Sequence, residues 1–190
     1  MMNYIYPFIL AMHSLWRWEV LMILAISLVD FFYKRKKELP FSPIDQFLVK
    51  TTVISFYIQL AMGVGLYVLS PITQYFLQHF NKAVHLRQIR FFGMEHSSMM
   101  IIAAICLTLG VLKSRNADTS DRRFKILFIW FGLALLIILS SIPWEFSPLT
   151  SRPSFRSFYL AIFPISVSFI THGIHSFFEI IGSTQIRQCI

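Results

Sequence analysis

Ionisable side chains lie inside apolar runs of this sequence, where a membrane-spanning helix normally carries few of them. His13 and Arg17 belong to the stretch HSLWRWE at 13–19, and Glu95 and His96 belong to MEHSSMM at 94–100. An imidazole can ligate a metal or pass a proton, and a guanidinium–carboxylate pair can neutralise charge inside a membrane. These side chains are therefore the first candidates for chemistry.

An ion pair between Arg17 and Glu95 is the first expectation. At a rise of 1.5 Å per residue, Arg17 and Glu95 lie roughly 25 Å and 27 Å from the basic ends of their predicted helices. The two helices run parallel, and Glu95 is the acid on another helix nearest to the level of Arg17. Because an unpaired ion at membrane depth costs several kcal/mol, we expect a structural Arg17–Glu95 pair.

The same stretch leaves two points open. Glu19 projects about 200° around the helix from Arg17, so it needs a separate partner, a water molecule or a proton. Trp16 and Trp18 could also belong to an interfacial aromatic belt, with Arg17 extending outward to the headgroups. A long, tilted first helix would allow that placement.

The two histidines share a sequence context. His13 and His96 are each followed by serine, each lies early in a helix that starts on the outer side, and the helices that follow end in the similar words VLSPI and LSSIP. This pattern indicates a parallel two-plus-two repeat that would set the histidines face to face. Facing imidazoles suit the iron of a bis-histidine haem b, and Gly63 and Gly65 could give room to the macrocycle edge. Alternatively, the glycines serve only close helix packing.

The elements that must position these residues are membrane helices. Of the 190 residues, 56 % are hydrophobic and 14 % are charged, and the mean hydropathy is +0.63. This composition is typical of integral membrane proteins. We therefore expect an all-α membrane protein, a four-helix transmembrane bundle plus a fifth C-terminal transmembrane helix. The apolar runs long enough to span lie at 5–32, 47–69, 91–112, 126–142 and 158–181.

Two parts of the chain follow from these runs. Residues 1–146 form the predicted four-helix membrane domain, and residues 147–190 form the C-terminal transmembrane helix and a short cytoplasmic tail. Within the first part, apolar residues of the segment 71–90 recur three or four positions apart, with polar residues between them. It predicts a short amphipathic helix lying on the outer surface.

The fifth helix carries a polar stripe of its own. In THGIHSFFE, the spacing of His172, His175 and Glu179 places all three on one helix face. Such a stripe could relay protons or, with another subunit, complete a metal site. The alternative is a polar face turned toward a partner subunit or internal water.

Charge predicts the orientation and the partners. The cluster at 34–37 follows the first apolar run, and further basic residues flank the loop at 113–125. By the positive-inside rule these segments are cytoplasmic, with the N-terminus outside and the C-terminus inside. The net charge of +8 is shared among short loops without a contiguous basic module, so we expect lipid headgroups as partners and no nucleic acid.

Several chemistries are disfavoured by the sequence. Cys106 and Cys189 lie at different depths, which excludes a disulfide between them and a CxxC metal site. No Ser-His-Asp arrangement, Walker loop or HExxH zinc motif is present. Whether the chain is an enzyme is left open.

Four stretches of the sequence carry a family resemblance. HSLWRW, YIQLAMGVGLYVLSP, MEHSSMM and IPW resemble the signatures of small bacterial inner-membrane proteins, common in Bacteroidota, that are often labelled cytochrome B or cytochrome b-like. The resemblance covers about residues 10–146. Many members carry a histidine just before the IQL stretch, where this chain has Tyr57 and Ile58. The resemblance implies functional positions at His13, Arg17, Glu95 and His96.

Two classes of function are therefore expected. The first is an integral membrane b-type cytochrome-like subunit that passes electrons between a quinol and a redox partner subunit. The second is a non-redox membrane subunit or small proton-linked transporter, in which the Arg/Glu/His cluster is structural or carries protons. Either could be part of an oligomer.

Overall fold

The computed structural model describes residues 2–144, and within this range every regular element is helical. The prediction of an all-helical chain is confirmed for this part. The predicted fifth helix, with His172, His175 and Glu179, lies outside the described residues, as does Cys189. The long helices are α1 (Met2–Lys36), α2 (Pro43–Leu69), α6 (His96–Arg115) and α7 (Ser120–Ser140).

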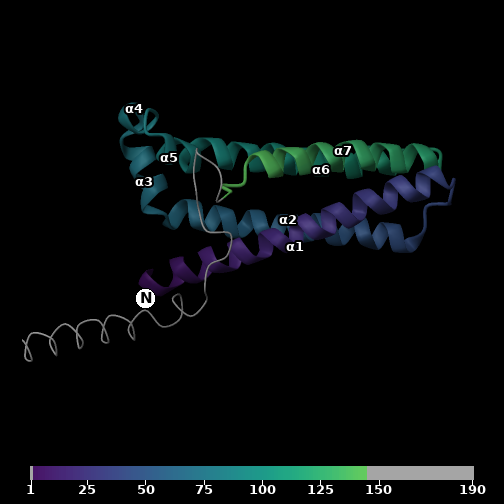
Figure 1. Cartoon of the computed structure of the whole chain (residues 1–190), viewed down its shortest axis with the longest axis horizontal. Coiled ribbons are helices and arrows are strands. Elements are labelled where there is room, and N and C mark those ends of the chain that lie inside the picture. The colour runs from purple at the N-terminus through teal and green to yellow at the C-terminus, as the bar shows by residue number, and fades with distance from the viewer. Residues whose placement is uncertain (1, 145–190) are drawn as a thin grey trace, which may run out of the picture.

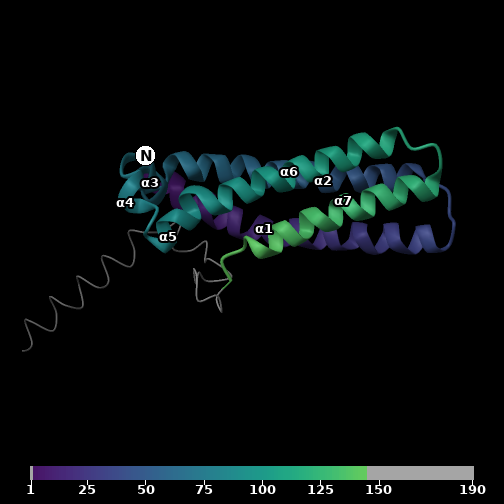
Figure 2. The same ribbon diagram turned by 90° about the horizontal axis from the view of Figure 1, so that it is seen from above.

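Short helices connect α2 to α6 at one end of the molecule (Figure 1). They are α3 (Pro71–Gln78), α4 (Phe80–Ala83), α5 (Arg87–Arg90) and the π-helix η1 (Phe91–Glu95). The α1–α2 and α6–α7 loops lie together at the opposite end, as Figure 2 also shows. The long helices therefore alternate in direction, with α1 and α6 running one way and α2 and α7 the other.

Three helical stretches are long and apolar enough to cross a membrane: Pro43–Leu69, Arg87–Arg115 and Ser120–Ser140. Helix α1 is longer but carries Arg17, Glu19 and Asp30 between its ends. Large apolar side chains also cover the outside of the bundle, for example Val29, which is 69 % exposed, and Leu136, which is 66 % exposed. These features indicate a membrane protein whose apolar surface contacts lipid.

The helices begin and end where the local sequence stabilises their termini. Ser42 and Asp45 form a capping box at the start of α2, with Pro43 in the first turn. Helix α1 ends on Lys34, Arg35 and Lys36, whose positive charges suit the negative end of a helix dipole.

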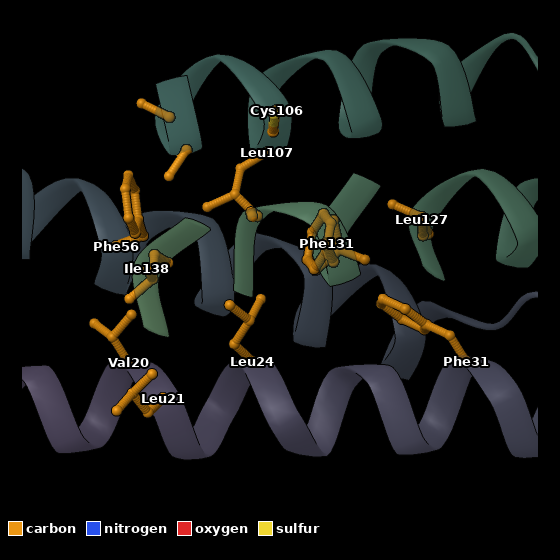
Figure 3. Close-up of a cluster of buried hydrophobic side chains, with 14 of the residues drawn as sticks. Val20, Leu21, Leu24, Phe31, Phe56, Cys106, Leu107, Leu127, Phe131 and Ile138 are labelled. Atoms are coloured by element: carbon orange, nitrogen blue, oxygen red, sulfur yellow. The ribbon is translucent and has the colours of Figure 1, made fainter. Parts of the chain in front are cut away.

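A buried apolar layer joins the four long helices (Figure 3). Leu24 and Phe31 of α1, Leu107 of α6 and Phe131 of α7 are completely buried. The Phe31 and Phe131 rings meet edge to face with their centroids 5.6 Å apart. At Gly110, an added Cβ would lie 2.7 Å from the Cβ of Trp130, so a glycine is needed where α6 crosses α7.

Polar contacts close the end of the bundle that carries the two loops. Lys34 binds the fully buried carboxylate of Asp45, and it also lies 3.2 Å from Asp30. Arg35 pairs with Asp121 of α7 at 2.9 Å. These bonds fix the end of α1 against the starts of α2 and α7.

Candidate functional site around His13 and His96

The structure brings His13, Arg17 and His96 together near the end of the bundle opposite the loops. His13 and Arg17 lie on α1, and His96 is the first residue of α6, directly after η1. His13 is within electrostatic range of both His96 and Arg17, and His96 is within range of Arg17. Residues from two helices that are far apart in the sequence thus form one cluster.

Helix α2 covers His13 from one side. A Cβ added at Gly63 would lie 3.3 Å from Cε1 of His13, so the missing side chain gives the imidazole its space. Gln59, one turn earlier on α2, donates an amide hydrogen bond of 2.9 Å to the main-chain oxygen of His13. The Nδ1 atom of His13 is buried and makes no hydrogen bond of ordinary geometry among the described residues, and the ring lies near the main chain of Gln59. A buried imidazole nitrogen without such a hydrogen bond is available to a ligand.

Helix α7 orients His96 from another side. Nδ1 of His96 lies 2.9 Å from the main-chain oxygen of Ser141, the C-cap residue that directly follows α7. A carbonyl oxygen only accepts, so Nδ1 carries the hydrogen and donates it. This leaves the lone pair of a neutral imidazole on Nε2. Metal-ligating histidines are typically held in this way by their other ring nitrogen.

The structure corrects the predicted partner of Glu95. Within residues 2–144, Glu95 pairs with Arg90 at 2.6 Å and not with Arg17. Arg90 also donates to the main-chain oxygen of Val84 at 3.1 Å. The Arg17 guanidinium lies 5.3 Å from the centroid of the Trp18 ring.

The π-helix explains this difference. The prediction of an Arg17–Glu95 pair assumed an ordinary α-helix, in which residues five apart point to different faces. In η1 the hydrogen bonds run from i to i+5, so Arg90 and Glu95 are brought onto the same face. Residue spacing in the sequence does not reveal a π-helix.

The structure gives Glu19 a partner that sequence reasoning did not name. Ser55 of α2 donates its hydroxyl to the Glu19 carboxylate. The Trp16 indole donates to the hydroxyl oxygen and to the main-chain oxygen of Ser55, at 3.1 Å and 3.2 Å. Trp16 and Glu19 are three residues apart and so share a face of α1. This shared face was the sequence feature that could have predicted a polar partner such as Ser55 on a neighbouring helix.

The predicted outer amphipathic segment packs against η1. Phe76 of α3 is almost fully buried, and a Cβ added at Gly93 would lie 2.3 Å from Cγ of its ring. The Tyr67 hydroxyl donates to the main-chain oxygen of Gly93 at 2.8 Å. The segment therefore positions the turn from which Glu95 and His96 project, a role that its apolar periodicity alone did not predict.

The two candidate glycines differ in their surroundings. Gly63 lies against His13, as described above. Gly65 has no atom within 4 Å of an added Cβ. Of these two glycines, only Gly63 makes space for a candidate ligand, the His13 ring.

No protein-family model matches the chain, and neither the curated proteins nor the solved structures give a significant match. The resemblance to cytochrome b-like membrane proteins therefore stays a prediction.

Proposed function

We propose that this chain is a b-type cytochrome-like membrane subunit that holds haem b between His13 and His96 and passes electrons between a quinol and a redox partner. Three features of the described residues support the proposal. Two imidazoles on different helices lie within electrostatic range of each other. His13 has a buried nitrogen without an ordinary hydrogen bond, and His96 keeps Nε2 for a ligand.

The donor set fits a haem iron. His13 and His96 would supply the two protein ligands that the iron of a bis-histidine haem takes. Bound haem would supply one-electron redox chemistry. The observation that carries the proposal is the hydrogen bond from Nδ1 of His96 to Ser141, because it is the orienting contact that ligating histidines use.

The residues of this chain would each have a separate task. His13 and His96 would hold the iron. The Ser141 carbonyl would keep the His96 ring oriented and increase the basicity of Nε2. Gly63 would keep α2 close to His13 without displacing its ring.

Visible spectroscopy of the full chain, purified after expression with haem available, tests the proposal. A Soret band and a sharp reduced alpha band are expected, since two axial imidazoles make the iron six-coordinate and low-spin. His13→Ala and His96→Ala should each remove or shift both bands. His79→Ala and His85→Ala are the matched controls, because both side chains are exposed, and they should leave the spectrum unchanged.

A second candidate function is a non-redox membrane subunit or small proton-linked transporter. The hydrogen bonds of Ser55 with Glu19 and with Trp16 favour it, because they join α1 to α2 without a cofactor. In this case the preparation should stay colourless after haem reconstitution, and Glu19→Gln should change stability or proton uptake.

The proposed location is a bacterial inner membrane, with the N-terminus outside. The two loops at the same end of the bundle contain or adjoin Lys36, Lys37, Lys113 and Arg115. Placing that end in the cytoplasm follows the positive-inside rule. The cluster around His13 and His96 would then lie in the outer half of the membrane.

A further inference from the structure

A groove runs between α2 and α6 on the surface of the bundle, away from the histidines. Val53 and Ile54 of α2 and Val111 and Leu112 of α6 form its apolar walls. The groove holds about 260 Å³ of space and is partly open along its length. This volume is below the roughly 300–1,000 Å³ of sites that enclose a whole drug-sized molecule, so it suits one part of a longer ligand that continues along the surface.

The groove is bounded by different chemistry at its two ends. Lys50 and Arg115 line the end near the loops. At the other end the Tyr57 hydroxyl and Oγ1 of Thr108 are hydrogen bonded at 2.7 Å. The described residues that line the groove include no Asp or Glu.

The two cations lie at the same level. Lys50 is seven residues before Tyr57 on α2, and Arg115 is seven residues after Thr108 on α6. Seven residues make two helical turns, about 10 Å, and return to the same helix face. Because α2 and α6 run in opposite directions and the hydroxyl pair joins them, both cations lie about 10 Å from that pair on the side of the loops.

We propose that this groove binds an anionic phospholipid of the leaflet at the loop end, with its phosphate between Lys50 and Arg115 and an acyl chain along the apolar walls. The charge complementarity commits the site to an anionic headgroup, because two exposed cations flank a groove without a carboxylate. Basic pockets between membrane helices bind such headgroups. The Tyr57–Thr108 pair marks the depth at which the groove ends.

Native mass spectrometry of the delipidated full chain, titrated with phosphatidylglycerol or phosphatidylcholine, tests this site. The wild type should bind at least one phosphatidylglycerol, with at least tenfold preference over phosphatidylcholine. The double variant K50Q/R115Q should lose most of that preference. The charge-preserving variant K50R/R115K should keep it, which separates the role of charge from a general loss of structure.

Lys36→Gln together with Lys37→Gln is the matched control. It removes the same charge from the same end of the bundle, at residues that do not line the groove. This control should change the preference by less than twofold. An equal loss of lipid preference in K36Q/K37Q would show that general surface charge causes the preference, and it would overturn the proposed site.

Filling the groove gives a second test. Val53→Trp should displace phosphatidylglycerol while leaving Lys50 and Arg115 in place. Unchanged binding in this variant would overturn the seating of the acyl chain. A lipid-independent dimer that Val53→Trp dissociates would assign the groove to a second copy of the chain instead.

Discussion

Nδ1 of His96 lies 2.9 Å from the main-chain oxygen of Ser141, so the end of α7 orients the first side chain of α6. Across the bundle, His13 occupies the space that Gly63 leaves on α2. Each histidine is thus held by a helix other than its own. This arrangement makes the geometry of the cluster sensitive to single methyl groups at neighbouring positions.

Gly63→Ala tests the contact between α2 and His13. The new Cβ would lie 3.3 Å from Cε1 of His13, so the ring must shift by a few tenths of an ångström. If His13 is an axial ligand, haem content or the alpha band should change, and overpacking should destabilise the protein by about 1 kcal/mol. The readouts are the reduced spectrum and thermal unfolding in detergent.

Gly65→Ala is the control for this change. It adds the same methyl group two residues away, into open space. The spectrum should not change, and stability should hold or rise because alanine favours the helix over glycine. Equal effects of the two substitutions would contradict a specific contact at Gly63.

The close contact between Phe76 and Gly93 predicts that Gly93→Ala destabilises the protein, and that a second substitution at Phe76 restores part of the stability. In Gly93→Ala, Cβ would lie 2.3 Å from Cγ of Phe76, and the overlap involves the rigid base of the ring. We expect a loss of about 1–3 kcal/mol in the free energy of unfolding, as for overpacked cores. Adding Phe76→Ala should recover part of the loss, which a double-mutant cycle measures. Strictly additive losses would argue against this packing.

The Arg90–Glu95 pair predicts a small coupling. Its side chains are 36 % and 42 % exposed, so solvent screens the pair. Arg90→Gln and Glu95→Gln should therefore couple by about 0.2–1 kcal/mol, the range of exposed ion pairs. Measured in the same detergent, Arg17→Gln and Glu95→Gln should be close to additive. A larger coupling of Glu95 to Arg17 than to Arg90 would restore the pair predicted from the sequence.

Cysteine labelling of whole cells tests the orientation. A cysteine placed at Asn81, in the segment with α3 and α4, should react with a membrane-impermeant reagent from outside. One placed at Asn116, in the α6–α7 loop, should react only after the membrane is opened. The reverse pattern would move the His13 and His96 cluster to the cytoplasmic half of the membrane.

Much of the helical architecture follows from local sequence. Apolar runs of sufficient length predicted the long helices, and the start of α2 follows from the local capping residues Ser42, Pro43 and Asp45. Helix α1 extends from Met2 to Lys36, beyond the predicted run at 5–32, because an apolar run marks the membrane-spanning part of a helix and not its ends. The membrane-spanning count of four plus one stays a prediction, since three of the described helical stretches are long and apolar enough to cross a bilayer.

The site was less predictable because it depends on rotation of the helices. His13, Arg17 and His96 were candidates from the sequence, and the structure places them within electrostatic range of one another. The partner of Glu95 was wrong because η1 changes the residue spacing of a turn. Ser55 and Gln59 were not identified because a polar residue on α2 shows its partner only when the face turned to α1 is known.

Rescue by free imidazole tests the central claim most directly. The variant His13→Gly would remove one proposed axial ligand and leave a gap beside His96 and Gly63. We predict that its haem becomes high-spin, and that added imidazole restores the low-spin alpha band of the wild type. The His79→Gly protein should be low-spin with or without imidazole. A low-spin spectrum in His13→Gly without imidazole, or a wild-type protein that takes up no haem, would contradict ligation by His13.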